Sequence, residues 1–141
     1  MDAVLVPVGD DLYAVPIGWV REVVPRPPLT ELVTAPPTVL GLFNLRGEIV
    51  PLLDTAVMLA LGRGGPVSFA VVLNTHLGPV GLSATAVPER TLLDDLMGPS
   101  ELPGSAGRYR VGRRVAVLLD VEALLDAVAP TAHRADAAVA G

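Results

Sequence analysis

The sequence predicts a mainly β protein built from two similar lobes. Fourteen prolines and fourteen glycines are spread along the 141 residues, and this spacing favours many short strands over long helices. Two stretches, VPLLDTAVML and VAVLLDVEALL, share the order strand, aspartate, helix, and their aspartates, Asp54 and Asp120, stand 66 residues apart. A repeat of about half the chain indicates two related lobes, although a Leu-Leu-Asp string also recurs by chance.

Strands are expected wherever a short apolar run lies between turn-forming residues. These runs are Val4–Val8, Leu12–Val15, Val20–Val24, the hairpin Gly41–Leu53, the pair Val67–Leu73 and Leu77–Ser83, and the pair Tyr109–Val111 and Val115–Leu119. The segment from Asp94 to Gly107 is rich in turn residues and is expected to be a long loop. The alanine-rich end, Thr131–Gly141, has no apolar period and is expected to be a frayed tail.

Two short helices interrupt the strand pattern. Asp54 stands before Thr55–Leu61, which Gly62 follows, and an aspartate before a helix with a glycine after it forms the usual pair of helix ends. Asp120 stands before Val121–Val128, which Pro130 stops. A paired acid–base role for the two aspartates is the alternative, and helix capping explains both of them better.

The charge balance excludes several classes of partner. The net charge is −5, and all ten cations are arginines. An acidic chain lacks the basic face that nucleic acids and anionic membrane surfaces require. There is no cysteine, the N-terminus lacks the basic region of a secretory signal, and no apolar run reaches the roughly 18 residues that span a membrane. A soluble, cytoplasmic protein is expected.

No set of residues in the sequence indicates catalysis. Two isolated histidines, His76 and His133, without cysteine do not form a metal site. Ser83 lies outside any G-x-S-x-G pattern, and neither glycine-rich nucleotide-binding motif is present. We therefore expect no enzyme, no metal and no cofactor.

The hairpin over Gly41–Leu53 carries the most informative corner. Gly47 can adopt a positive φ, which predicts a Leu45-Arg46-Gly47 loop that ends in a glycine bulge. Arg46 is the only cation of this corner. Glu22, an acid in a valine-rich strand, needs a partner, and Arg46 could supply a bidentate contact.

The residues around this corner resemble a known family. Asn44-Leu45-Arg46-Gly47, followed by Val50-Pro51 and Asp54, is similar to the signature of the CheW-like coupling proteins of bacterial chemotaxis. The likeness includes DLYAVPI at residues 11–17, VREVV at residues 20–24, the approach from Pro36 to Gly41, and the closing Val117–Leu125, so it covers roughly Ala3 to Val128.

This resemblance implies a fold and a domain organisation. It implies two small five-stranded SH3-like β-barrels packed together, with short helices after Asp54 and Asp120. It implies one domain over residues 1–130. The first lobe would cover about residues 12–66, and the second about residues 67–130 together with the N-terminal strand. Residues 131–141 would form a disordered tail.

The resemblance also implies a non-catalytic adaptor. In the family, the first barrel binds the regulatory domain of the histidine kinase CheA, and the groove between barrels binds the cytoplasmic tip of a methyl-accepting chemoreceptor. Glu22, Arg46 and Gly41 match family positions that matter for coupling, and Val20 and Val87 match positions that line the groove. Each has a structural alternative: an exposed ion pair for the charged residues, a strand bend at Gly41, and core packing for the valines.

The second lobe departs from the family pattern. Ala84-Thr85 replaces the usual valine–aspartate pair, and Pro88 follows closely, so receptor binding is less secure than kinase binding. Two other functions remain open at this point: a small-ligand-binding β-barrel protein, and an adaptor of a pilus-motility or other chemosensory pathway.

Overall fold

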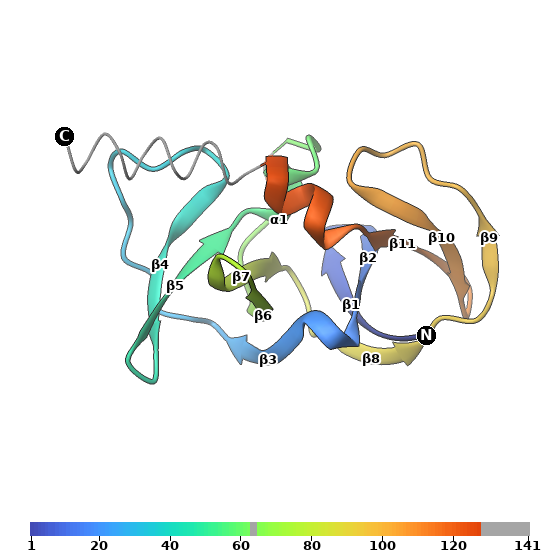
Figure 1. Cartoon of the computed structure of the whole chain (residues 1–141), viewed down its shortest axis with the longest axis horizontal. Helices are drawn as coiled ribbons and strands as arrows, with labels where there is room; N and C mark the ends of the chain where they lie inside the picture. The colour runs from blue at the N-terminus through green and yellow to red at the C-terminus, as the bar shows by residue number, and fades with distance from the viewer. Residues whose placement is uncertain (63–64, 128–141) are drawn as a thin grey trace.

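The chain folds into two β-sheets with short helices, as the sequence predicts (Figure 1). The structure is a computed structural model that describes residues 1–62 and 65–127. Eleven strands lie within these residues, five in one sheet and six in the other. The mainly β architecture with two lobes is confirmed, and the second lobe has one strand more than expected.

The first sheet takes its five strands from one continuous part of the chain. Its order is β3-β6-β7-β5-β4, with β3 at Val20–Pro25, β4 at Val39–Leu45, β5 at Glu48–Leu53, β6 at Phe69–Thr75 and β7 at Gly78–Ala84. All neighbours are antiparallel except β5 and β7, which run parallel and pair Leu52 with Gly81. The two edge strands, β3 and β4, are the first two strands of this sheet along the chain.

The second sheet joins the two ends of the chain. Its order is β8-β1-β2-β11-β10-β9, with β1 at Asp2–Val8, β2 at Asp11–Pro16, β8 at Glu89–Leu92, β9 at Leu96–Gly98, β10 at Ser105–Val111 and β11 at Arg114–Leu119. The central β11 and β2 are parallel and pair Leu118 with Ala14. A 3-10 turn, η1 (Ile17–Trp19), leads from β2 into β3.

Sheet membership differs from the predicted lobes in a regular way. The strand near Leu12 belongs to the six-stranded sheet, and β6 and β7 belong to the five-stranded sheet. The N-terminal hairpin β1–β2 fills in the second sheet the place that β6–β7 fills in the first. The expected loop over residues 94–107 contains β9 and the start of β10, and β8 was not predicted.

Both predicted helix caps are present. Asp54 Oδ1 accepts hydrogen bonds from the N–H groups of Ala56 (3.1 Å) and Val57 (3.2 Å), and α1 covers Thr55–Met58. The helix ends earlier than expected, and Ala60 just after it has a left-handed φ of 60°, as Gly62 also does at 83°. Asp120 Oδ1 accepts from the N–H of Ala123 (3.1 Å), at the start of a helix over residues 121–127.

Two further expectations at this end, the stop at Pro130 and the tail from Thr131, lie outside the described residues. No helix in the described part of the chain is long and apolar enough to cross a membrane.

Buried side chains form three clusters, and the largest of them joins the two lobes. One cluster lies inside each lobe, around Phe43 and Leu52 in the first and around Leu12 and Leu118 in the second. The largest cluster combines residues of both sheets with both helices, including Val15, Leu73, Leu82 and Leu125. Because this shared cluster is fully buried, the two sheets pack as one unit.

Candidate functional site

A two-residue turn forms the tip of the hairpin β4–β5. Leu45 pairs with Glu48, so Arg46 and Gly47 alone make the loop. Both have positive φ, 49° and 90°, as in the type I′ turns that match the twist of paired strands. The expected three-residue loop with a bulge is therefore wrong. Asn44 Oδ1 accepts a hydrogen bond from the N–H of Gly47 at 2.9 Å, which fixes the turn.

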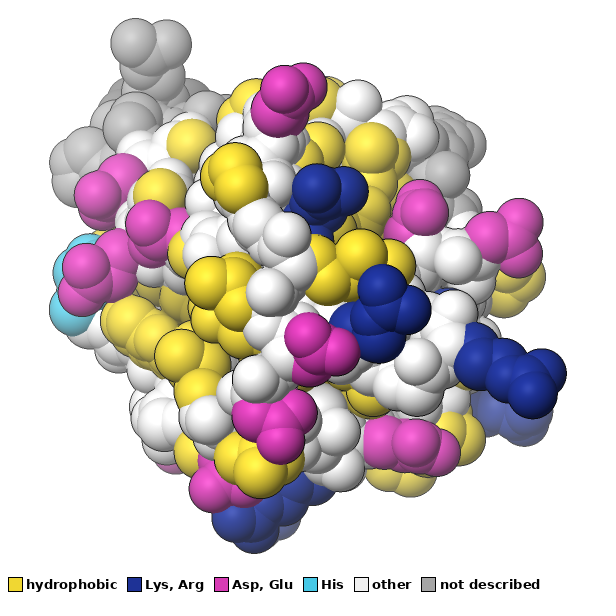
Figure 2. All heavy atoms as spheres, turned by 90° about the vertical axis from the view of Figure 1, so that its right-hand side faces the viewer, with side chains coloured by type: hydrophobic (Ala, Val, Ile, Leu, Met, Phe, Trp, Pro, Cys, Tyr) yellow, Lys and Arg dark blue, Asp and Glu magenta, His cyan; other side chains and the backbone are white. Residues whose placement is uncertain are grey.

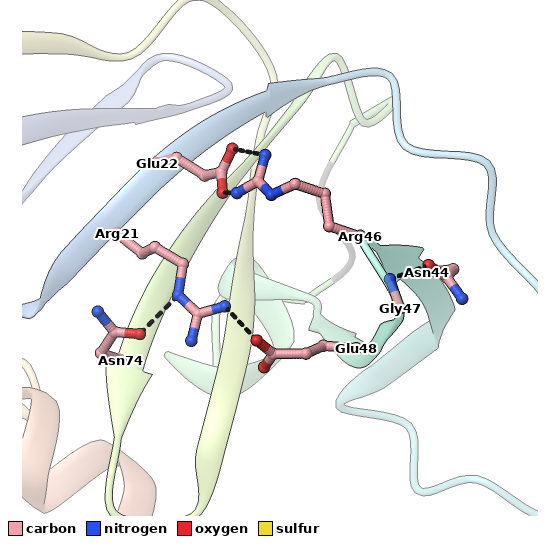
Figure 3. A network of polar contacts seen from close by, with 7 residues as sticks. All are labelled: Arg21, Glu22, Asn44, Arg46, Gly47, Glu48 and Asn74. Carbon is pink, nitrogen blue, oxygen red and sulfur yellow. Dashed lines mark hydrogen bonds and ion pairs between the residues drawn. The ribbon is translucent and has the colours of Figure 1, made fainter.

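The Arg46 guanidinium reaches from this tip to Glu22 on β3 (Figure 3). Nη1 donates to Oε2 at 3.2 Å and Nη2 donates to Oε1, so the contact is bidentate. The Arg46 side chain is 71% exposed, whereas that of Glu22 is 27% exposed. Glu22 is thus held in place by a cation that water and partners can reach.

A second polar contact runs beside the first. Arg21 Nη1 donates to Glu48 Oε1 at 3.2 Å, and its Nε donates to Asn74 Oδ1 at 2.6 Å. The two ion pairs have opposite polarity, since β3 supplies the cation in one and the anion in the other. The two ion pairs therefore join β3 to the tip of a hairpin with which it shares no strand pairing.

An irregularity in β3 explains how two adjacent residues face the same hairpin. In a regular strand, Arg21 and Glu22 would point to opposite faces. The pairing of β3 with β6 shifts between Val20, opposite Leu73, and Glu22, opposite Val72, so Arg21 is an extra residue on β3. A bulge of this kind re-aims side chains, and Figure 3 shows both directed at the hairpin tip.

The polar network adds little to folding and lies beside exposed apolar side chains. Exposed ion pairs contribute about 0–1 kcal/mol each to folding, so these two pairs are a small part of the stability of the lobe. Val23 and Ile49, each next in sequence to a residue of the network, are 37% and 57% exposed. Apolar side chains beside a few fixed charges are typical of protein–protein contact surfaces.

The remaining predicted site residues occupy different environments. Gly41 is buried in β4, and a Cβ there would lie 2.8 Å from the carbonyl oxygen of Thr30. Val20 is half-buried against the core shared by the lobes. Val87 is 58% exposed in the connection between β7 and β8. Leu45 is half-buried at the end of β4.

A groove of about 370 Å³ lies in the second lobe, where the parallel strands β2 and β11 begin. Its lining consists of Asp10, Asp11, Leu12, Tyr13, Arg114, Val115 and Val117. Burial, with a smaller contribution from the Asp11 carboxylate, raises the pKa of Tyr13 to about 12. The groove presents both signs of charge beside the side chains of Leu12, Tyr13, Val115 and Val117.

At the end of the molecule that carries β9, the described residues form no charged patch of one sign (Figure 2). Figure 2 shows acidic, basic and apolar side chains intermingled on this face. Two ion pairs belong to this lobe, Arg90 with Asp2 at 3.5 Å and Arg110 with Asp95 at 3.6 Å.

Sequence reasoning found one half of the polar network and missed the other. It singled out Arg46 and Glu22 but gave no role to Arg21, Glu48 or Asn74. The sequence did hold a signal. Arg21-Glu22 and Arg46-Gly47-Glu48 each contain one cation and one anion, and both lie in segments that resemble the same family. The bulge that brings Arg21 to the same side has no local sequence mark.

Comparisons with known proteins agree on one family. A family model described as a CheW-like domain matches residues 2–129. A probable chemotaxis protein CheW of Rhizobium etli is 29% identical over 127 residues, covering 83% of this chain and 82% of that protein. A chemotaxis protein CheW of Rhizobium meliloti is 33% identical over 90 residues, covering 62% of this chain and 58% of that protein.

A solved structure shares the fold. The crystal structure of the scaffolding protein TtCheW from Thermoanaerobacter tengcongensis matches with a TM-score of 0.72 and 22% identity, covering 84% of this chain and 82% of that one. At this identity, the likeness shows the two-lobed fold alone.

Proposed function

Because this chain belongs to the family of CheW-like domains, we propose that it is a non-catalytic chemotaxis adaptor. It couples the cytoplasmic tips of methyl-accepting chemoreceptors to the regulatory domain of the histidine kinase CheA, within a cytoplasmic signalling array at the membrane. Residues 1–130 act as one unit in this role. The names of the relatives support the pathway, since both are chemotaxis proteins.

The observation that carries this proposal is the double ion pair at the β4–β5 tip. Arg46 and Glu22, Arg21 and Glu48 form a polar network at the surface, next to exposed Ile49. The network offers a partner charges in fixed positions on a well-defined backbone turn. Such a surface favours specific binding in one orientation over catalysis. The turn residues Asn44, Leu45 and Gly47 shape this tip, whereas Gly41, Val20 and Val87 would contribute to coupling from other parts of the molecule.

The direct test is co-purification from defined components. The purified chain is mixed with the CheA regulatory domain and with a receptor cytoplasmic fragment from the same organism, separately and together. An adaptor forms a stable complex with the kinase domain and a ternary complex with both. Failure to bind either partner at concentrations of tens of micromolar contradicts the proposal, and binding to the kinase alone restricts it to the first lobe.

The groove of the second lobe supports a second candidate, a small-ligand-binding protein. Asp10, Asp11 and Arg114 place both signs of charge in one groove, which suits a zwitterionic metabolite. A thermal-shift screen with amino acids separates this function from the first. A ligand-dependent shift that Arg114→Ala removes favours ligand binding, and no shift with any amino acid contradicts a zwitterion site in this groove.

A further inference from the structure

The connection between β3 and β4 crosses the outer edge of the first sheet. We name residues 26–38 the strap. The N–H of Thr30 donates to the Leu42 carbonyl at 2.8 Å, and the N–H of Leu42 donates to the Thr30 carbonyl at 2.9 Å. Because β4 is an edge strand, this bridge satisfies backbone groups that would otherwise face solvent or another strand.

Only glycine leaves room for this bridge at position 41. An ideal Cβ on Gly41 would lie 2.8 Å from the Thr30 carbonyl oxygen, 3.3 Å from its carbon and 3.4 Å from Leu29 Cβ. The closest atom belongs to backbone, so it cannot rotate away as a side chain can. Gly41 has no positive φ, so its role here comes from space and not from conformational freedom.

The middle of the strap depends on this bridge. The ends are held elsewhere, by the Arg26 N–H on the Ser68 carbonyl and the Val39 N–H on the Pro36 carbonyl, both at 2.9 Å. Within the described residues, the Thr30–Leu42 pair alone joins residues 27–35 to the sheet by backbone hydrogen bonds. The strap carries Leu32, 45% exposed, and Val33, fully exposed, so its position decides where two apolar side chains are presented.

We propose that Gly41 is a positioning residue that seats the strap on β4. It lies buried beneath Thr30, so its influence on partner binding passes through the place of the strap and needs no direct contact with a partner. The effect on binding rests on the proposed adaptor function, whereas the seating itself is a property of the isolated chain. The two parts can therefore fail separately.

Two variants unseat the strap from opposite sides. Gly41→Ala places a methyl group against the Thr30 carbonyl. Thr30→Pro leaves Gly41 intact but removes the N–H that donates to Leu42. Gly18→Ala is the matched control, because a Cβ at Gly18 meets nothing within 4 Å and its φ is not positive. Each full-length variant is compared with the parent by amide hydrogen exchange, thermal melting and pull-down with the kinase domain and receptor fragment.

Both unseating variants should speed exchange of the Leu42 amide by roughly threefold to tenfold, the equivalent of one hydrogen bond lost. Amides of β6 and β7 should keep their protection, and Gly18→Ala should change neither. In the pull-down, Gly41→Ala and Thr30→Pro should weaken binding to the same extent, and the double variant should be no weaker than either, because both act on one contact.

Three results overturn the inference. Unchanged exchange at Leu42 in Gly41→Ala shows that the strap is not seated by this glycine. Normal binding by Thr30→Pro with weak binding by Gly41→Ala shows that a partner touches Gly41 itself. If Gly41→Ala does not fold, Thr30→Pro carries the test alone, and unchanged Leu42 exchange there has the same meaning. If the parent binds no partner, the adaptor function fails while the exchange result still decides the seating.

Discussion

The hairpin β4–β5 with α1 and the hairpin β10–β11 with its helix share one backbone plan and differ at their tips. In both, the N–H of the capping aspartate donates to a residue 16 positions earlier, Asp54 to Thr38 at 2.7 Å and Asp120 to Gly104 at 2.8 Å. Each hairpin also supplies the strand that pairs in parallel with its neighbour. The two aspartates that suggested a repeat thus make equivalent backbone hydrogen bonds in the two lobes.

The tips separate the two lobes. The first tip is Arg46-Gly47, with positive φ at both residues, and it is joined to β3 by two ion pairs. The second is Gly112-Arg113, with positive φ at the glycine only. The strand equivalent to β3 is β8, and its Arg90 pairs with Asp2 on neighbouring β1. The polar network of the first tip is therefore an addition to a scaffold that both lobes share.

Gly104 offers the strongest way to break the shared plan. A Cβ there would lie 2.3 Å from Leu124, and the residue has φ 80°, so alanine would suffer both overlap and strain. Gly104→Ala should lower the free energy of unfolding by about 2–4 kcal/mol. Denaturant unfolding measures this loss.

A matched substitution sharpens the result. Gly9→Ala also sits at a positive φ, 61°, but its Cβ would meet nothing within 4 Å, so it should cost about 1 kcal/mol. Equal losses in the two variants would show that Leu124 does not press on Gly104.

Tyr13 distinguishes the lobes by pH, because β7 carries Val80 at the equivalent place. Its pKa is raised from 10.0 to about 12. The unfolded chain releases the phenolic proton near pH 10 while the folded chain keeps it, so stability is intact below pH 10 and falls between about pH 10 and 12. The loss should reach up to about 3 kcal/mol. In Tyr13→Phe, the free energy of unfolding should depend less on pH across this range. The same pH dependence as in the parent would contradict the raised pKa.

The two capping aspartates should differ in weight. Asp54 is 6% exposed and accepts two backbone hydrogen bonds, whereas Asp120 is exposed and its side chain accepts one. Asp54→Ala should therefore cost about 1–2 kcal/mol and Asp120→Ala about 0.5–1 kcal/mol. Thermal melts of both variants at neutral pH check the order, and a larger loss at Asp120 would reverse the comparison.

Thr38, the first-lobe counterpart of Gly104, should give the smallest effect. Its hydroxyl is buried without a hydrogen-bond partner among the described residues. Thr38→Val removes that polar atom and keeps the shape, so stability should stay the same or rise by up to about 1 kcal/mol. A clear loss of stability would mean that the hydroxyl has a partner, such as a bound water.

Local patterns predicted the parts of the fold that depend on neighbours in sequence. The caps at Asp54 and Asp120 and the reversal at Gly47 follow from backbone needs that few residue types meet. The strand Leu96–Gly98 was missed because it is three residues long and is held by its pairing with β10. The N-terminal strand was expected in the second lobe, where β1 lies, but the strand near Leu12 was expected in the first lobe and lies in the second sheet as β2. Long-range pairing of this kind leaves no local mark.

The candidate site divides in the same way. Arg46 and Glu22 were paired correctly because a lone cation on a corner and a lone acid in an apolar strand each need a partner. The contact of Arg21 with Glu48 depends on the bulge in β3, and the seat under Thr30 depends on the path of the strap. Both are tertiary features, so a single sequence does not contain them in readable form.

The most direct test of a recognition network in the first lobe is a double-mutant cycle on Arg46 and Glu22, read by stability and by binding. Arg46→Ala, Glu22→Ala and the double variant should each stay within about 1 kcal/mol of the parent in unfolding, because the Arg46 side chain is 71% exposed and solvent screens the pair. Each should weaken binding to the kinase domain and receptor by roughly tenfold or more, without further loss in the double variant. Arg113→Ala, at the second tip, should bind as the parent does. Unfolding of the single variants, or parental binding by Arg46→Ala, would contradict the account.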